Sequence, residues 1–283
     1  MRFLRIALLI SVCLISMGKI QAQVDFHLGL TTGCGATFVA DKGISDAPRY
    51  KSVMTYNWSP VGINAGVDFG KKFGLTVEGI VANHGQNFSI IDIADKVVGG
   101  REIDLKYFQL PVLMRFMNEG NSAVRGNFNL GGQVSFLTSA TDKLYYSAST
   151  QTFPAGAALP TGAVGVKRPD GNTQAIVRAQ PETIIMSNKD GDFKKIGYQV
   201  VAAFGLDFDL SRHLYFSVQL RGNYNLMDMR SGKTIDEVKQ HQTADVYGRR
   251  ADYQIGLQGG VHYVFSSTRS FRFKGAKPAA YRH

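Results

Sequence analysis

Apolar and polar residues alternate over eight separate segments of this chain, and the alternation limits the possible folds more than any other feature. A period of two is typical of β-strands that have one apolar face. In residues 196–226, for example, the apolar positions run from Ile196 to Phe208 and again from Leu214 to Leu226. The opposite face carries Gln, Ser, Arg and Asn side chains, which an ordinary protein core does not gather. We therefore expect the apolar face to look outward, at lipid.

The connections between the eight segments alternate in length. Long connections span about 37–59, 84–101, 138–192 and 227–249, whereas short ones span 70–74, 117–122 and 209–213. An up-and-down sheet has all its short turns at one end, and closure of eight strands into a ring leaves no unpaired edge. The prediction is an all-β fold: a closed eight-stranded antiparallel up-and-down transmembrane β-barrel with long extracellular loops and short periplasmic turns.

Aromatic residues provide a second test, because outer-membrane barrels carry aromatic girdles at both membrane interfaces. Two bands about ten residues apart, the span of a tilted transmembrane strand, are predicted here. The band near the short turns consists of Phe26, Phe69, Phe116, Phe208, Phe216, Tyr263 and Phe265. The band near the long loops consists of Phe38, Phe88, Phe136, Tyr198, Tyr224 and Tyr253. Soluble barrels put apolar residues inside, so this pattern favours the outer membrane.

The two ends of the chain differ from the middle. Residues 1–23 have two arginines, a short apolar run and a small-residue exit at Ala22, which is the pattern of a secretory signal peptide. Residues 24–265 form the predicted barrel domain, and residues 266–283 form a basic tail expected in the periplasm. That tail is either a solvated end or an electrostatic attachment to headgroups, peptidoglycan or a periplasmic partner. Export leaves Cys34 as the one cysteine, which excludes an intramolecular disulfide.

The net charge of +10 does not indicate nucleic-acid binding. The signal segment and the tail together contribute eight positive charges and no acid, which leaves about +2 for the barrel domain. No continuous basic surface for a phosphate backbone is implied. Partners are instead expected to be outer-membrane lipid and other outer-membrane or periplasmic proteins.

The fourth segment changes the parity of its apolar positions. Ile103, Leu105 and Tyr107 share one parity, and the apolar residues from Leu110 to Phe116 share the other. Because Pro111 cannot donate a ladder hydrogen bond, we predict a β-bulge at residues 108–111. The same parity assignment puts a network of polar side chains in the lumen, where charges must be paired. The predicted network is Glu78, Asp104, Lys106, Arg115, Arg125, Arg221, Asp252 and His262. A plugged barrel is expected, with a gated small pore as the alternative.

Catalysis, metal binding and cofactor binding have little support in the sequence. His84 and His241 are expected in outer loops, near acids such as Asp92, Asp236 or Asp245, but no GxSxG motif is present. No CxxC, HExxH or EF-hand spacing occurs either. We therefore expect no enzyme, no metal and no cofactor.

The longest connection, 138–192, holds half of the prolines: Pro154, Pro160, Pro169 and Pro181. Loops of this length are usually functional or disordered. The two interpretations are a mobile surface loop and a docking surface for another outer-membrane or surface protein.

Three stretches of the chain resemble the PorT-like outer-membrane β-barrel proteins of Bacteroidetes-type Gram-negative bacteria. They are the signal ending "QAQ", the opening strand "FHLGLTTG" and the segment "LKYFQLPVLMRF". The resemblance implies an eight-stranded barrel in the outer membrane and no common activity. We expect a non-enzymatic accessory or scaffold subunit of a larger assembly for secretion, barrel assembly or uptake. The alternatives are a stand-alone structural or adhesion barrel that binds through its surface loops, and a narrow pore.

Overall fold

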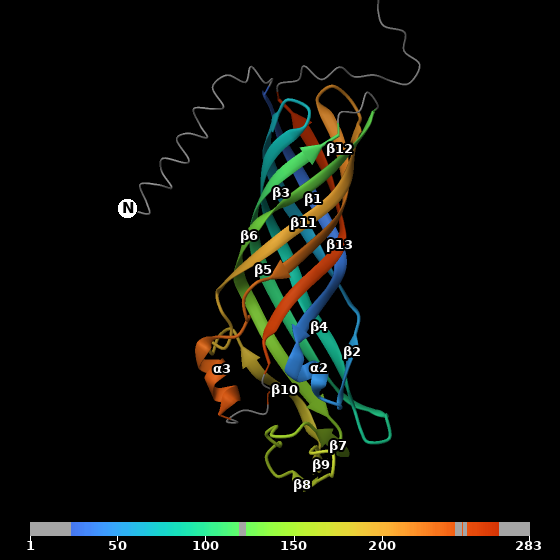
Figure 1. The fold of residues 1–283 in the computed structure, drawn as a ribbon, viewed down its shortest axis with the longest axis vertical. Helices are drawn as coiled ribbons and strands as arrows, with labels where there is room; N and C mark the ends of the chain where they lie inside the picture. The colour runs from blue at the N-terminus through green and yellow to red at the C-terminus, as the bar shows by residue number, and fades with distance from the viewer. Residues whose placement is uncertain (1–23, 119–122, 241–244, 246–247, 266–283) are drawn as a thin grey trace, which may run out of the picture.

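The computed structural model describes residues 24–118, 123–240, 245 and 248–265. Within them, eight strands pair antiparallel in a closed ring, because β13 pairs with both β12 and β1. The strands are tilted relative to the long axis of the barrel (Figure 1). The predicted fold class is confirmed. The ring consists of β1 (Val24–Asp41), β3 (Thr55–Phe69), β4 (Phe73–Ile91), β5 (Val97–Met117), β6 (Val124–Tyr146), β11 (Ile196–Asp209), β12 (Leu214–Asn225) and β13 (Arg250–Val264).

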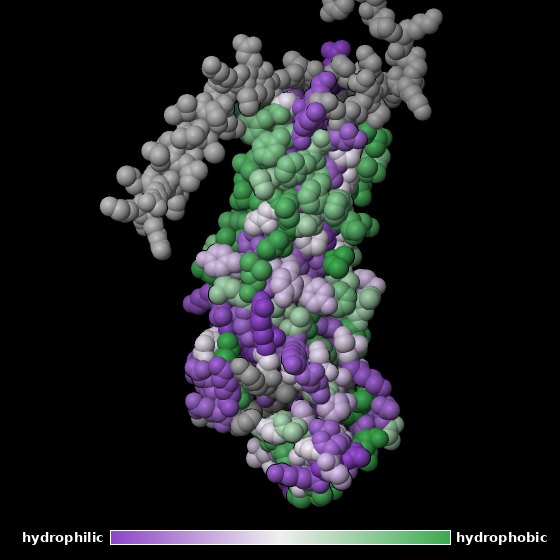
Figure 2. Space-filling model, in the orientation of Figure 1, coloured by the Kyte–Doolittle hydropathy of each residue, from purple (hydrophilic) through white to green (hydrophobic). Residues whose placement is uncertain are grey.

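The part of the barrel near the short turns has its apolar side chains outside. Leu30 and Phe204 are each 63% exposed on the wall, whereas the intervening positions point inward and are mostly polar. Figure 2 shows hydrophobic side chains over this part of the surface and hydrophilic ones toward the opposite end. This distribution suits a wall that contacts lipid and a lumen filled with hydrogen-bonding groups. No helix among the described residues is long and apolar enough to cross a membrane.

The part of the barrel near the long loops has the reverse arrangement. Its interior contains an apolar core beside buried ion pairs, and many polar residues of the same strands, such as Asp104 and Lys106, lie outside. The core consists of Val39, Ile44, Phe88, Ile103, Leu105, Tyr107, Ala140, Met186, Phe193 and Met229. An apolar interior with a polar exterior is the arrangement of a protein in water. The strands therefore continue from the lipid-facing region into a water-facing one.

This reversal corrects the prediction of a β-bulge in β5. In β5 the odd-numbered residues from Arg101 to Met117 point inward without interruption, so the bulge expected at residues 108–111 is wrong. The register shift lies between Lys106 and Tyr107 on the β6 side, where Thr138 is an extra residue without a β5 partner. The apolar residues of β5 occupy inward positions in the water-facing region and outward positions in the lipid-facing region, so the strand needs no bulge to explain the change.

The same reversal explains why the sequence pattern assigns three side chains to the wrong face of the barrel. Asp104 and Lys106 are exposed on the outside of β5 and do not belong to the lumen network. Phe88 is buried in the apolar core and is not part of an aromatic girdle. The other residues of the predicted girdles have outward parity and are at least partly exposed. Among them, Phe38 and Tyr253 stack across β1 and β13 with ring centroids 4.9 Å apart.

Short elements cover the long-loop end and form, with the adjoining ends of β4, β5 and β6, what we call the head. β2 pairs with β4, β10 pairs with β6, and β7, β9 and β8 form a separate sheet (Figure 1). Residues 138–192, expected as a loop, thus contain the end of β6 and four further strands. The short elements are α2 (Lys42–Asp46), β2 (Tyr50–Val53), β7 (Ser149–Phe153), β8 (Val164–Lys167), β9 (Thr173–Val177), β10 (Gln180–Ser187) and α3 (Gly232–Lys239).

The head has a second apolar core of its own. Phe153, Ala175 and Val177 of the small sheet pack against Ile90, Leu144 and Tyr146 of the long strands. This packing attaches the small sheet to the barrel, because burial of apolar surface is the main stabilising term in folding. Residues 1–23 and 266–283, expected as signal peptide and tail, lie outside the described residues.

Candidate functional site

The middle of the lumen is occupied by an ion pair between β4 and β12. Arg221 Nη1 lies 2.5 Å from Glu78 Oε2 and 3.0 Å from Gln258 Oε1, while its Nη2 lies 3.2 Å from Gln133 Oε1. Both charged side chains are less than a tenth exposed. A buried guanidinium with several acceptors on different strands holds the opposite walls together and fills the space between them.

A second group of charges lies near the short turns. Arg115 contacts Asp207 and donates to Tyr215 Oη at 3.0 Å, and its Nη1 lies 3.7 Å from Asp68 Oδ1. Arg125, at the rim, donates to Asp209 at 2.7 Å and is more exposed than the lumen arginines. Sequence reasoning missed Asp68 and Asp207, although both have the inward parity that the prediction used.

His84 lies in the barrel rather than in a loop. His84 was expected in an outer loop but is buried in β4, with Nδ1 2.8 Å from Asp252 Oδ2 and Nε2 3.1 Å from the Gln109 side chain. Asn225 also donates to Asp252, at 2.7 Å. The pairing of His84 with a loop acid is therefore wrong. His241 lies outside the described residues.

His262 has neighbours of the kinds found in hydrolases. Its Nε2 lies 2.7 Å from Ser217 Oγ and its Nδ1 lies 3.1 Å from Asn64 Oδ1, while its ring stacks on Tyr215 at 4.4 Å. All four residues are buried. A nucleophile must be reached by its substrate, and the cavity beside these groups measures about 10 Å³. These four side chains pack together and fill this part of the lumen.

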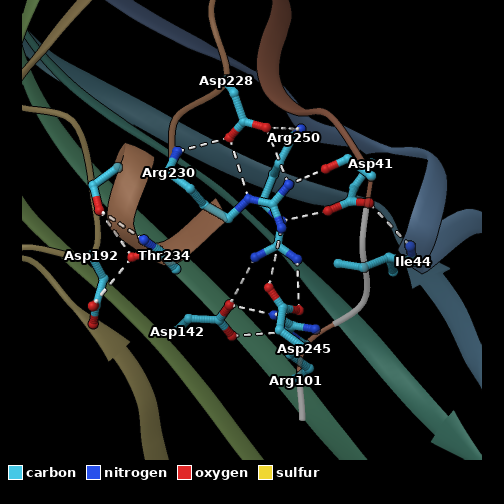
Figure 3. Close-up of polar contacts among 12 residues, drawn as sticks. Asp41, Ile44, Arg101, Asp142, Asp192, Asp228, Arg230, Thr234, Asp245 and Arg250 are labelled. Carbon is cyan, nitrogen blue, oxygen red and sulfur yellow. Dashed lines mark hydrogen bonds and ion pairs between the residues drawn. The ribbon is translucent and has the colours of Figure 1, made fainter. Parts of the chain in front are cut away.

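The largest group of charges closes the long-loop end, and we call it the arginine cluster (Figure 3). Arg250 donates to Asp41 at 2.6 Å and to Asp245 at 2.9 Å, joining the ends of β13 and β1 to the connection that follows α3. Arg101 holds Asp142 through two hydrogen bonds of 2.9 and 2.6 Å. The arginine cluster consists of Arg101, Arg230 and Arg250 with Asp41, Asp142, Asp228 and Asp245.

Asp245 is the centre of this cluster. It accepts from Arg101 at 2.8 Å, from Arg250 at 2.9 Å and from Arg230 at 3.3 Å. Burial by itself would raise the pKa of Asp245, but the three guanidinium groups hold that pKa well below its ordinary value. The same balance lowers the pKa of Asp228, where burial is outweighed by the hydrogen bond and charge of Arg230.

Helix α3 is fixed over the arginine cluster by the residues around its start. Ser231 caps the helix by accepting from the Thr234 backbone N–H at 3.3 Å. The Ser231 backbone N–H donates to the Asp192 carbonyl at 2.7 Å, and the Thr234 hydroxyl donates to the Asp192 carboxylate at 3.4 Å. The segment that carries Arg230 and the end of the 138–192 connection are thereby joined (Figure 3).

Two cavities lie among the lumen side chains of the described residues, and both are small. The cavity lined by Arg221, Gln109 and Gln254 measures about 30 Å³ and the one beside His262 about 10 Å³. Since a water molecule needs ~10–15 Å³, these cavities fit isolated waters and no organic ligand. In the parts of the chain described above, no group of three or more His, Cys, Asp or Glu side chains is placed to hold a metal ion.

Six of the eight predicted lumen residues lie inside the barrel or at its rim: Glu78, Arg115, Arg125, Arg221, Asp252 and His262. Asp104 and Lys106 lie outside. The arginine cluster was missed altogether. A usable signal was present for Asp41, which keeps the inward parity of its strand beyond the apolar stretch, whereas Asp142 points inward only because Thr138 is an extra residue of β6.

Comparison with known proteins places the chain in a family. A model described as an outer membrane protein beta-barrel domain matches residues 21–231, more than half of the chain. No curated protein matches it. Similar solved structures include OprG from Pseudomonas aeruginosa (13% identity, TM-score 0.40, 87% of this chain and 98% of that one). They also include Neisserial surface protein A (8%, 0.37, 86% and 99%) and the attachment invasion locus protein Ail of Yersinia pestis (11%, 0.35, 85% and 99%). The chain belongs to the outer membrane protein beta-barrel domain family and is an outer-membrane β-barrel protein.

Proposed function

We propose that this protein acts by binding, as a non-enzymatic accessory or scaffold subunit of a larger outer-membrane assembly for secretion, barrel assembly or uptake. We further propose that it is a PorT-like member of its family. The observation that carries the binding role is the combination of a filled lumen and a folded head. Short turns of such barrels face the periplasm, so the head faces the outside of the cell and offers the surface for a partner.

The filled lumen supports binding over conduction. The Glu78–Arg221 pair crosses the middle, and the arginine cluster closes the end beneath the head. Opening a path would require several buried ion pairs to separate, each at a cost of several kcal/mol. A planar-bilayer recording of the purified protein is expected to give no sustained conductance, and large steady currents would favour the pore instead.

The folded head also supports a binding role. It consists of ordered strands with two apolar cores, and surfaces of this kind recognise partners without first paying an ordering entropy. The deciding experiment is extraction of the native protein from its own outer membrane in mild detergent, followed by measurement of mass and composition. A defined heavier complex is expected, and a single species no heavier than the 31.0 kDa full chain plus detergent would refute the accessory role.

A stand-alone adhesion barrel is the second candidate. It is favoured by an apolar stripe on the small sheet, where Val164, Val166 and Ile176 are 73, 70 and 65% exposed. Val164 and Ile176 are direct partners across β8 and β9, so the stripe is continuous. Replacement of all three by Ser should abolish surface binding if the protein is an adhesin, and should leave a native complex intact if the stripe is not its docking surface.

A further inference from the structure

The side of the head carries an open hollow of about 450 Å³ where β5, β6 and β10 meet. Its origin is local. β10 leaves its register with β6 between Gln180 and Thr183. Pro181 lies in that interval and has no backbone N–H to donate. The two strands separate there, and the hollow lies in the space between them.

Tyr145 forms an aromatic wall of the hollow. It is paired with Gly100 across β5 and β6. A Cβ atom on Gly100 would lie 2.7 Å from the Tyr145 Oη and 2.9 Å from Cζ, so the phenol ring lies across the strand at a position that only glycine permits. Gly100 is buried beneath the ring, while Tyr145 is still 41% exposed. The hollow therefore has an aromatic surface held against a strand and open to water.

Polar groups surround this aromatic surface. Glu182 is held by Lys143, with Nζ and Oε1 2.9 Å apart, and its side chain is 58% exposed. Gln180 and Ser147 provide an amide and a hydroxyl on the same rim. None of these groups is a buried charge, so each can exchange a water for a ligand hydroxyl at little cost. The hollow thus combines an aromatic face with hydrogen-bond donors and acceptors.

The chemistry of the hollow selects its ligand. A phosphate would need free cations, but Lys143 is neutralised by Glu182. A lipid tail is excluded by position, because Tyr145 lies nine residues beyond Phe136 in β6, or ~30 Å along the strand at ~3.3 Å per residue. A pyranose has an apolar C–H face that fits against an aromatic ring and a rim of hydroxyls that fits polar neighbours. We propose that this hollow is a saccharide-binding site.

The site is independent of the accessory role proposed above. Two sources offer the required chemistry at the cell surface: polysaccharide of the bacterium's own outer membrane, and glycans of the surroundings. The probes are therefore two. One is polysaccharide released and delipidated from the producing cells, and the other is a printed array of neutral and anionic oligosaccharides. Both are tested against the purified full-length protein in detergent.

Four variants distinguish an effect of the aromatic ring on binding from a general effect on the folded protein. Tyr145→Ala should weaken binding about tenfold or more, because the stacking surface is lost. Tyr145→Phe retains the ring and should bind within about threefold of the wild type. Gly100→Val should weaken binding as Tyr145→Ala does, since the new side chain displaces the ring. Tyr56→Ala removes a tyrosine that is 68% exposed elsewhere on the wall and should change nothing.

Three results would overturn the proposal: no binding to either probe, binding that is unchanged in Tyr145→Ala, or equal loss in Tyr145→Ala and Tyr56→Ala. Binding of the cells' own polysaccharide alone assigns the site to the bacterial surface, and binding of array glycans alone assigns it to an external ligand. If Gly100→Val does not fold, the contrast between Tyr145→Ala and Tyr145→Phe still decides, because neither adds bulk.

Discussion

Tyr107 and Phe108 are consecutive residues of β5, yet their side chains lie in different media. Tyr107 is 4% exposed inside the apolar core of the head, and Phe108 is 41% exposed on the outer wall. From Phe108 to Phe116 the outward residues of β5 are mostly apolar, whereas Asp104 and Lys106 are the outward residues beyond. The outer boundary of the lipid contact therefore crosses β5 near Phe108.

This boundary predicts that substitution by Arg has a large effect at one position of β5 and a small effect at another. Val112 lies midway between Phe108 and Phe116 and is 49% exposed on the wall, so Val112→Arg should lower the free energy of unfolding by about 2–4 kcal/mol. Asp104→Arg, on the same face outside the lipid, should change it by about 0–1 kcal/mol. Urea unfolding in lipid vesicles measures both. Equal costs at the two positions would place the boundary elsewhere.

The lumen predicts a contrast between two ion pairs. Glu78→Ala leaves the Arg221 guanidinium buried, so the free energy of unfolding should fall by about 3–5 kcal/mol. Asp209→Ala removes the partner of Arg125 at the more exposed rim and should cost about 1 kcal/mol or less. The measurement is again equilibrium unfolding in vesicles. The double variant Glu78→Leu with Arg221→Met should recover most of the loss, and failure to do so would mean that the pair does more than fill the lumen.

The fold was predictable because alternation and connection lengths are properties of the chain itself. The reversal of parity was not. A β-bulge and a change from lipid-facing to water-facing surroundings produce the same sequence pattern, because both move the apolar residues from odd to even positions or the reverse. Pro111 favoured a bulge, although the real irregularity is at Thr138, a residue with no unusual character in the sequence.

The lumen and head networks were predictable only in part, for a different reason. Inward parity identifies which side chains enter the barrel, and it did so for Glu78 and Arg221. It does not identify partners, because these depend on register and tilt. Arg101 and Asp142 are 41 positions apart and Arg101 and Asp245 are 144 apart, yet they are in direct contact. Arg101 and Asp142 meet across the paired strands β5 and β6, and the connection that follows α3 brings Asp245 to them.

The arginine cluster predicts how the head responds to acid. Because the pKa of Asp245 is lowered in the folded protein, its stabilising contribution is fully present above its unfolded pKa of about 3.9 and is lost as the pH falls through the lowered value. The protection of the α3 amides, which is the observed exchange rate relative to the intrinsic rate at each pH, should therefore be the same at pH 7 and pH 5. Lower protection at pH 5 would show that another group holds the helix.

Asp245→Asn tests the same contact at neutral pH. The amide cannot neutralise the three arginines, so Thr234 and Val238, both buried in α3, should exchange faster at pH 7. Asp236→Asn makes the same chemical change at an exposed position of the helix and is the matched control. Similar acceleration in both variants would mean that the effect comes from loss of net charge.

The extra residue Thr138 predicts an unusual tolerance to deletion. It lies between the part of β6 that pairs with β11 and the part that pairs with β10, and it has no partner in β5. Its removal leaves Phe136 outside and Ala140 inside, so the alternation of β6 becomes continuous and the barrel should still fold. Deletion of Gly132 has the opposite consequence, because the following residues change faces and Gln133 moves to the lipid side. The folded fraction, read from heat-modifiable migration on gels, should be near wild type without Thr138 and strongly reduced without Gly132. Equal loss in both deletions would mean that Thr138 sets the register of the head.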